Sequence, residues 1–399
     1  MRQRHGGAPT LGLLAALLAS TEAVHAQSEQ APPAADAPAE ALTPEPAPAS
    51  ASVSASEPAP QSEAEPESQE GFEPSLHLKI FSDVNFVKQS GEHSAFRLGG
   101  VDFFLTGELS DQFSALSESL LELEEGGTEF DLERIYLEWH PRSWFQLRFG
   151  RDHLMMGRYM QTYHHALLLQ LATERPLLFA FEDDGGFLPA HQIGVEAKGD
   201  LTFPSFVLHY ALGLGNGRGQ FGEDVLNTLD RNSFKSRLAQ LAVLPDFAPG
   251  LELGISGYWD EIPPGDASPS GEALIPNDIA EYIVSGHAAY VAYPIDAQAE
   301  GYWLLHRDVT TEQRTHMLGG FLQLGIDFAA WCPYARLEAI QRSAGDAFFN
   351  ASAAPQRFTE LRGGLRYSLA DQAVLKLEYA REFEGSTNTV VLQAAFGVP

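Results

Sequence analysis

The chain has 399 residues, of which 54 are acidic and 25 basic, and its formal net charge is −29. Such an acidic excess argues against nucleic acid as a partner, because proteins that bind phosphate backbones present clustered Lys and Arg. Cys332 is the only cysteine, so the chain forms no disulfide of its own and is not a small cross-linked scaffold. Its stability must come from backbone hydrogen bonding and packing.

The first residues predict export from the cytoplasm. Arg2 and Arg4 precede an apolar run at residues 11–18, and the small residues before Gln27 suit a cleavage site, so we expect residues 1–26 to be a signal peptide. No later stretch approaches the roughly 18 uncharged apolar residues of a transmembrane helix. No cysteine at the cleavage site could carry a lipid. Any membrane residence must therefore come from strands.

Residues 27–74 have the composition of a disordered tether. They are dominated by Ala, Pro, Ser and Glu, and residues 28–74 contain no Lys or Arg. Segments of this kind cannot bury enough apolar surface to fold. The residues that follow still carry an excess of about 20 acids. This excess would favour cations over anions in any water-filled path through the folded part.

From residue 75 onward, apolar and polar residues alternate in segments of about ten residues. In residues 145–150, for example, Phe145, Leu147 and Phe149 share one strand face, and Gln146 and Arg148 share the other. The predicted strands are 75–87, 95–109, 113–125, 129–140, 143–152, 190–200, 203–214, 234–244, 250–261, 279–292, 297–307, 315–328, 331–343, 357–369, 372–382 and 387–397.

The connectors between these strands are alternately short and long. The short set is 110–112, 141–142, 201–202, 245–249, 293–296, 329–330 and 371; the long set is 88–94, 126–128, 153–189, 215–233, 262–278, 308–314, 344–356 and 383–386. A soluble β-protein has no reason to keep every second connector short. The pattern predicts an all-β fold for residues 75–399, a transmembrane antiparallel β-barrel of about 16 strands with periplasmic turns and extracellular loops.

Aromatic residues fall where such a barrel would meet the two membrane surfaces, since Trp and Tyr prefer lipid interfaces. The alternative is a globular β-protein with ordinary core aromatics. The girdle residues are Trp139, Trp144, Phe203, Tyr293, Phe328 and Trp331 beside short turns, and Trp259 and Trp303 toward the other end.

The connector 153–189 is far longer than a barrel loop requires, and long loops are usually functional. Tyr159, Tyr163, Leu167 and Leu171 recur at a spacing of four, which predicts a short helix with one apolar stripe against the inner wall.

A cluster of acids lies further along this connector, at Glu182, Asp183 and Asp184. They would form a cation-attracting constriction or, with Glu174, a site for a divalent ion, although their spacing matches no calcium loop. The alternative is an acidic surface turn completed by two glycines.

Residues 149–199 resemble one family. The stretch FGRDHLMMGRYMQTYHHALLLQLATERPLLFAFEDDGGFLPAHQIGVEAKG is similar to the corresponding part of bacterial outer-membrane porins related to the phosphate-selective porin O and P group. The shared features are a Gly-Arg strand end, a His-containing segment, Arg-Pro-Leu, an acidic or glycine-rich bend and a Pro-x-His entry to the next strand. The resemblance implies a sixteen-stranded homotrimeric channel whose third loop folds inward. The constriction residues expected on that loop are Arg158, Glu174, Arg175, Glu182, Asp183 and Asp184.

Strand alternation places many charged residues on the inner face, where more acids than bases are expected. The predicted pore-lining residues are Asp102, Glu138, Arg148, Asp152, Glu196, Arg336, Glu338, Glu360, Arg362, Arg366 and Lys376. Opposed rows of acid and Arg create a transverse field that orders water and sorts polar solutes. The simpler interpretation is that these positions are charged only because they face water in the lumen. The family's anion selectivity depends on ladders of Arg and Lys that this chain largely lacks, so we expect a weak cation preference.

Two rival functions remain open at this point. An anion- or phosphate-selective porin is one, and an outer-membrane protease or lipase is the other. The enzyme would use pieces such as His306 with Asp308, or His209, but the sequence lacks a Gly-x-Ser-x-Gly motif. A barrel plugged by its long loop is a third interpretation.

No metal or cofactor is expected. His164 and His165 lie near His153 and His191 in the sequence, but neighbouring residues of a helix point in different directions and rarely share a metal.

The expected location is the bacterial outer membrane. The expected partners are lipid and lipopolysaccharide, small ions and polar solutes, further copies of the chain, and peptidoglycan through the tether, but no nucleic acid.

Overall fold

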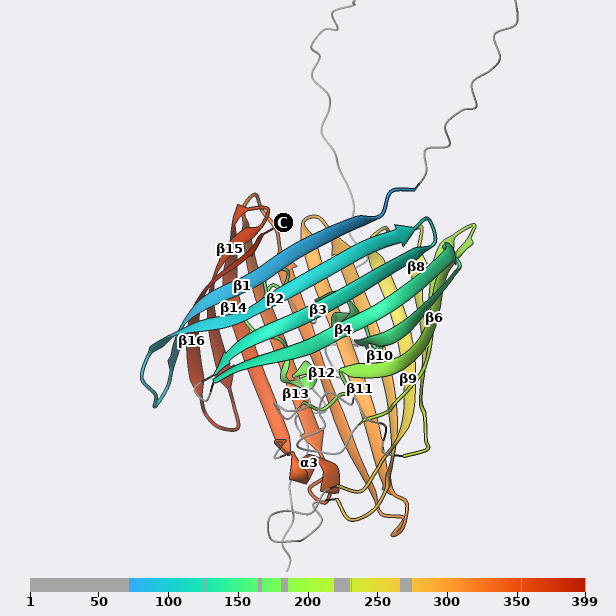
Figure 1. Cartoon of the computed structure of the whole chain (residues 1–399). Helices are drawn as coiled ribbons and strands as arrows, with labels where there is room; N and C mark the ends of the chain where they lie inside the picture. The colour runs from blue at the N-terminus through green and yellow to red at the C-terminus, as the bar shows by residue number, and fades with distance from the viewer. Residues whose placement is uncertain are drawn as a thin grey trace, which may run out of the picture. The chain divides into compact units, whose positions relative to one another are not determined.

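Sixteen antiparallel strands close into one barrel in which each strand pairs with its neighbours in sequence and β1 pairs with β16 (Figure 1). This computed structural model describes residues 72–124, 127–163, 167–180, 186–218, 230, 232–265, 275–352 and 354–398. The predicted signal peptide and nearly all of the predicted tether lie outside these residues. The predicted fold class and strand number are confirmed.

The strands occupy most of the described chain. They are β1 (Ser75–Gln89), β2 (Ala95–Ser110), β3 (Phe113–Glu124), β4 (Gly127–Arg142), β5 (Phe145–His153), β6 (His191–Phe203), β7 (Phe206–Gly215), β8 (Ser236–Pro245), β9 (Leu251–Ile262), β10 (Ile279–Ala292), β11 (Ile295–Asp308), β12 (Arg314–Ile326), β13 (Trp331–Arg342), β14 (Arg357–Ala370), β15 (Ala373–Glu382) and β16 (Asn388–Val398). The short helices are α2 (Tyr159–Tyr163), η2 (Leu177–Phe179) and α3 (Ala347–Ala351). None of the described helices has the length and apolar character needed to cross a membrane.

The alternation in the sequence corresponds to the two faces of the wall. In β15, Leu375, Leu377 and Tyr379 are exposed on the outer surface, whereas Lys376 and Glu378 are buried inside. This is the inverse of a soluble β-protein, and it places apolar side chains where lipid contacts a membrane barrel. The β1–β16 pairing, from Ile80↔Val398 to Gln89↔Thr389, completes the ring of ladders. Closure of this kind leaves no unpaired strand edge in the hydrocarbon region.

Two of the predicted short turns lie a few residues later than expected. The turn between β4 and β5 is Ser143-Trp144, and the turn between β6 and β7 is Pro204-Ser205. Proline has no N–H to donate to a ladder, so Pro204 ends the pairing of β6 and sets the position of the second turn.

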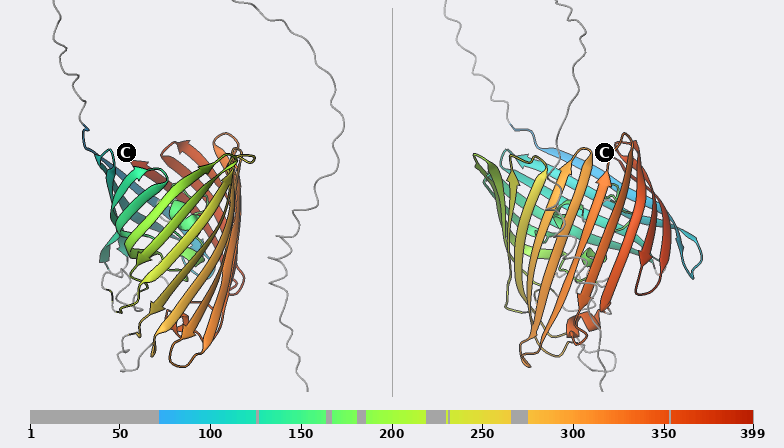
Figure 2. Two further views of the ribbon diagram at one scale, coloured as in Figure 1. Left: turned by 90° about the vertical axis from the view of Figure 1, so that its right-hand side faces the viewer. Right: turned by 180° about the vertical axis from the view of Figure 1, so that it is seen from behind.

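The start of β1 and the C-terminus lie at the short-turn end of the barrel (Figure 1). At the opposite end, the yellow-to-orange strands extend further than the blue-to-teal strands (Figure 2). Five of the six aromatic residues predicted beside the short turns are exposed, among them Trp144, Tyr293 and Trp331, and Trp139 is partly buried. Trp259 stacks on Tyr282 with ring centroids 5.8 Å apart toward the long-loop end.

A charge on the outer face should destabilise the barrel. Leu377 is half exposed near the middle of β15 and is paired with Leu365 and Leu392. We expect Leu377→Arg to lower the free energy of unfolding in lipid vesicles by about 2–4 kcal/mol, the cost of Arg near the bilayer midplane. Denaturant titration of the folded barrel measures this. Gln372→Arg at the adjacent turn is the matched control and should change stability little; equal effects of the two substitutions would show that the outer face of β15 does not contact lipid.

Candidate functional site

The described parts of the connector between β5 and β6, residues 154–163, 167–180 and 186–190, fold into the barrel and are called the inserted segment below. The ring of Phe179 stacks on Tyr159, with centroids 4.9 Å apart, and meets Tyr302 of β11 and Phe321 of β12 edge-on at 5.7 and 5.8 Å. These side chains belong to a core that also includes Leu178, Phe187, Leu304, Met317 and Ile340. The predicted inward fold of this connector is therefore present, and its contact with β11 and β12 is largely apolar.

The predicted helical stripe exists only in part. Helix α2 spans Tyr159–Tyr163, whose two tyrosine rings lie 5.5 Å apart. Leu171 packs in a separate small cluster with Cys332, and Leu167 lines the cavity described below. The four predicted residues therefore do not form one continuous stripe against the wall.

Carboxylates on the inner wall bind the backbone N–H groups of this segment. Glu300 accepts hydrogen bonds from the N–H groups of Arg158 and Tyr159 at 3.0 and 2.6 Å. Glu338 accepts in the same way from Leu177 and Leu178 at 3.0 and 2.8 Å. Since irregular backbone needs such partners at membrane depth, the two glutamates hold the segment in place.

Glu378 adds a third carboxylate contact. It accepts hydrogen bonds from the backbone N–H of Thr173 at 3.1 Å and from its hydroxyl at 2.6 Å. The tyrosine hydroxyl of Tyr334 donates to the same carboxylate at 2.8 Å. Glu378 therefore joins the segment to two neighbouring parts of the wall.

Cations on the inner wall bind the carbonyl groups of the same segment. Lys376 donates to the carbonyls of Leu167 and Ala172 at 2.6 and 2.9 Å. Arg336 donates to the carbonyls of Glu174 and Arg175 at 2.8 and 3.3 Å. The wall thus supplies acids for the donors of the backbone and cations for its acceptors.

This arrangement changes the role of three predicted pore-lining residues. Arg336, Glu338 and Lys376 point inward, but each is 1% exposed or less. They contact the backbone of the inserted segment and are not among the residues that line the cavity described next. Alternation identifies the inward face of a strand, but it does not indicate what occupies the lumen beside that face.

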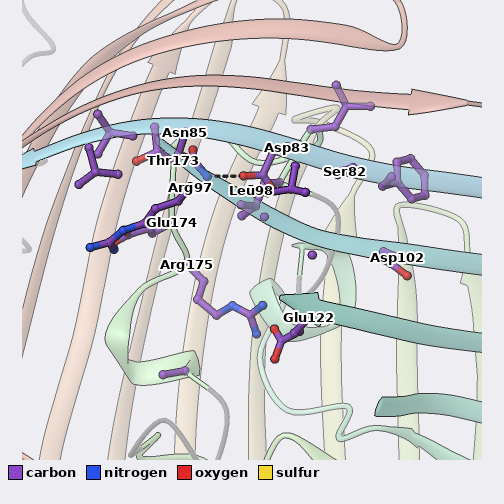
Figure 3. Close-up of a pocket in the computed structure, with 18 of the residues that line it drawn as sticks. Ser82, Asp83, Asn85, Arg97, Leu98, Asp102, Glu122, Thr173, Glu174 and Arg175 are labelled. Carbon is purple, nitrogen blue, oxygen red and sulfur yellow. Dashed lines mark hydrogen bonds between the residues drawn. The ribbon is translucent and has the colours of Figure 1, made fainter. Parts of the chain in front are cut away.

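A cavity of about 680 Å³ lies between the inserted segment and the β1–β3 side of the wall. It is bounded by β1–β3, β14 and residues 167–180 (Figure 3). Five of the predicted site residues line it: Asp102, Glu174, Arg175, Glu360 and Arg362. The other lining acids are Asp83 and Glu122, and the other lining base is Arg97. Acids therefore outnumber bases on the cavity wall.

Several charges around this cavity are in contact with a charge of opposite sign. Arg362 forms ion pairs with Glu174 at 2.6 Å, with Glu378 at 2.8 Å and with Glu360. Arg175 extends from the segment toward Glu122 on β3 (Figure 3). Glu174 is more than half exposed despite its ion pair, so its charge faces the open part of the cavity.

A second charged network covers the inner faces of β3–β6. Arg148 pairs with Asp152 at 2.6 Å and with Glu138, and Lys198 pairs with Glu138 at 3.1 Å. Glu196 lies 3.9 Å from Arg148. The structure thus brings together the four predicted residues of β4–β6, Glu138, Arg148, Asp152 and Glu196. The network is separate from the cavity lining.

The last two predicted residues with described positions lie elsewhere. Arg158 pairs with Glu252 at 3.1 Å, on the core-filled side. Arg366 donates to Ser368 at 3.1 Å. Glu182, Asp183 and Asp184 of the expected constriction lie outside the described residues, as do His164 and His165.

A buried polar cluster fastens α3 to the barrel at the long-loop end. Asp346 caps α3 by accepting from the N–H of Phe349 at 3.0 Å, and it contacts His306 Nδ1 at 2.9 Å. The other ring nitrogen of His306 lies 3.0 Å from Glu281, which also pairs with Arg218 at 3.2 Å. His306 therefore lies between Asp346 and Glu281. Nothing in the sequence pattern links these residues, which are far apart in the chain. Asp308, the candidate partner of His306 in the enzymatic alternative, instead accepts hydrogen bonds from Asn277 and from the N–H groups of Thr310 and Thr311.

One group of described residues has ligand atoms close enough to share a metal ion. These are Glu133, His153 and His191, whose ligand atoms all lie within 4.8 Å of one another. The two histidines were considered from the sequence, but Glu133 was not.

Comparison with known proteins identifies the fold. No family model matches this chain, and no curated protein is significantly similar to it in sequence. Solved outer-membrane barrels do match. The anion-selective porin from Comamonas acidovorans aligns with a TM-score of 0.58 at 12% identity, over 82% of this chain and 100% of that one. The trimer form of OmpT, an outer membrane protein of Vibrio cholerae, aligns at 0.56 and 13%, over 82% and 99%. The outer membrane channel DcaP of Acinetobacter baumannii aligns at 0.51 and 12%, over 82% and 99%. The chain has the fold of the outer-membrane porins.

The contact between Asp346 and His306 should respond to acid. Burial opposes ionisation of Asp346, but the nearby His306, the N–H of Phe349 and the hydroxyl of Thr315 outweigh it and lower its pKa to about 2. A carboxyl whose pKa is depressed on folding contributes stability above its unfolded pKa of about 3.9 and loses it as the pH falls toward 2. The contribution is about 2 kcal/mol.

We expect Asp346→Asn to remove this acid dependence and lower stability at neutral pH. Unfolding titrations between pH 2 and pH 7 measure both effects. Asp246→Asn, in the turn between β8 and β9, is the control and should leave the dependence intact. An unchanged pH profile in Asp346→Asn would contradict the role of this contact.

Proposed function

We propose that this protein is a porin of the bacterial outer membrane, a water-filled channel through which ions and small polar solutes diffuse passively. The observation that supports this proposal most directly is the charged cavity beside the inserted segment, inside a closed sixteen-stranded barrel. The likeness to known porins and channels supports this proposal through the fold. The export signal at residues 1–26 and a periplasmic tether at residues 27–74 belong to the same proposal.

The proposed path is displaced to one side of the barrel. The apolar core around Phe179 and Phe321 fills the side of β11 and β12, whereas the cavity follows β1–β3 and β14. A cavity of about 680 Å³ has room for many water molecules. Ions and small polar solutes suit these dimensions.

The cavity lining supports a weak preference for cations. The lining acids are Asp83, Asp102, Glu122, Glu174 and Glu360, and the lining bases are Arg97, Arg175 and Arg362. Carboxylates in a confined aqueous path raise the local concentration of cations. The preference should be small because the arginines lie close to several of these acids.

An anion- or phosphate-selective channel is the first alternative. The resemblance of residues 149–199 to the porin O and P group favours it, and so does the fold shared with an anion-selective porin. The positions of Arg336 and Lys376 argue against it, because both cations bind backbone carbonyls of the inserted segment. We therefore propose that the chain is related to the porin O and P group but does not share its anion selectivity.

An enzymatic barrel is the second alternative, and the histidine contacts argue against it. Both ring nitrogens of His306 lie beside carboxylates, so neither can accept a proton from a nucleophile. His209 contacts Asp200 near the short-turn end of the barrel. We propose that the protein is not an enzyme.

The proposed partners follow from this placement. Lipid and lipopolysaccharide would contact the apolar outer face, and the tether would contact peptidoglycan. We also propose a homotrimer, which the trimer form of the Vibrio cholerae protein supports by analogy of fold.

Reversal potentials in planar bilayers under a KCl gradient test the proposed function. We expect wild-type channels to prefer K⁺ over Cl⁻ by about twofold to fivefold. Glu174→Gln should reduce the preference, because it removes an exposed charge while Glu360 and Glu378 still pair with Arg362. Arg175→Gln should increase it.

The control for both variants is Glu312→Gln, an exposed acid that does not line the cavity and should leave the reversal potential unchanged. A strong preference for Cl⁻ would contradict the charge argument. The absence of any conductance would contradict the channel itself.

A further inference from the structure

We propose that Glu133, His153 and His191 form a binding site for a divalent transition-metal ion of the zinc class, placed where the inserted segment leaves the barrel wall. The three residues come from adjacent strands. His153 is the last residue of β5, His191 is the first of β6, and the two are paired across the ladder. The next backbone hydrogen bond, from the N–H of Leu154 to the carbonyl of Ala190 at 2.8 Å, joins the two ends of the inserted segment.

Glu133 reaches the two histidines through an irregularity of β4. The ladder between β3 and β4 pairs Glu118 with Arg134 and then Ser119 with Leu132, so Glu133 is the extra residue of a β-bulge. Bulges redirect a side chain from the position that regular alternation would give it. Arg151 donates to the carbonyl of Glu133 at 3.0 Å and holds the bulge against β5.

The geometry suits a metal that prefers nitrogen and oxygen ligands. Glu133 Oε2 lies 2.8 Å from His191 Nε2, and the rings of His153 and His191 lie 5.0 Å apart. Each of the three residues is at most 6% exposed. Two imidazoles and one carboxylate are a ligand set that zinc uses, with a water in the fourth position.

The surrounding charges are compatible with a bound cation. Asp131, two residues before Glu133, is close enough to interact electrostatically with both Glu133 and His191. Glu133 and Asp131 carry two negative charges against the one positive charge of Arg151, so the net charge beside the two neutral imidazoles favours a bound cation. A metal bound to all three residues would join β4, β5 and β6 where the inserted segment begins and ends.

Metal binding by the purified full chain in detergent tests this proposal. After removal of metal with a chelator, the protein is equilibrated with Zn²⁺, and bound zinc is counted by mass spectrometry and titrated against a chromophoric chelator. We expect one zinc per chain with micromolar or tighter affinity. His153→Ala and His191→Ala should each weaken binding by about 100-fold, the loss expected when one of three protein ligands is removed.

Two further variants separate a metal site from a hydrogen-bonded pair. Glu133→Gln keeps the volume and a hydrogen-bond acceptor for His191 but removes the charged ligand, so it should fold normally and still bind zinc at least tenfold more weakly. His316→Ala, at an exposed position of β12, is the matched control and should bind like the wild type. Heat-dependent gel mobility verifies that each barrel is folded.

Two results would overturn the proposal. One is a folded wild-type protein that binds no zinc at 100-fold excess. The other is zinc affinity that stays unchanged in Glu133→Gln and in both histidine variants, since the ion would then bind elsewhere. Neither result concerns ion conductance, so the proposed channel function is tested separately by the bilayer measurements.

Discussion

Hydrogen bonds between charged side chains of the inner wall and the backbone of residues 154–190 determine the interior of this barrel. An irregular segment at membrane depth must find partners for its N–H and C=O groups. Glu300 and Glu338 accept from its N–H groups, and Lys376 donates to its carbonyls. Because the wall supplies both signs, the segment can be bound without an uncompensated charge. The aromatic packing around Phe179 then excludes water from that side of the lumen.

The remaining space follows from where the segment lies. With the side of β11 and β12 filled, the cavity is confined to β1–β3 and β14, where more acids than bases line it. Selectivity should therefore depend on residues such as Glu122 and Glu174, and less on the net charge of the whole chain. Glu133, His153 and His191 lie at the root of the same segment, so a metal bound there would fix where the segment enters the lumen.

The sequence predicted the strands well because alternation and turn residues are local signals. It predicted the inward faces for the same reason, but it could not show which inward charges meet water. That depends on contacts such as Arg158 with Glu300, which are 142 residues apart. One available signal was missed: the run from Tyr302 to Leu305 is apolar on both faces, which is typical of a strand covered on both sides. The bulge that presents Glu133 has no comparable signature. The pair of His306 and Asp308, named only as a piece of the enzymatic alternative, could not reveal the contact of His306 with Asp346, which lies 40 residues further along the chain.

Cysteine accessibility in open channels tests the displaced path most directly. In a Cys332→Ala background, Asn85→Cys places a thiol on the cavity wall, and Ser285→Cys places one on β10, where Ser285 contacts Ser256 beneath Gly157. A charged thiol reagent added during single-channel recording should reduce conductance at once in Asn85→Cys and leave Ser285→Cys unaffected. Rapid block of Ser285→Cys, with Asn85→Cys unchanged, would show that ions pass on the side where residues 154–190 are bound and would contradict the account.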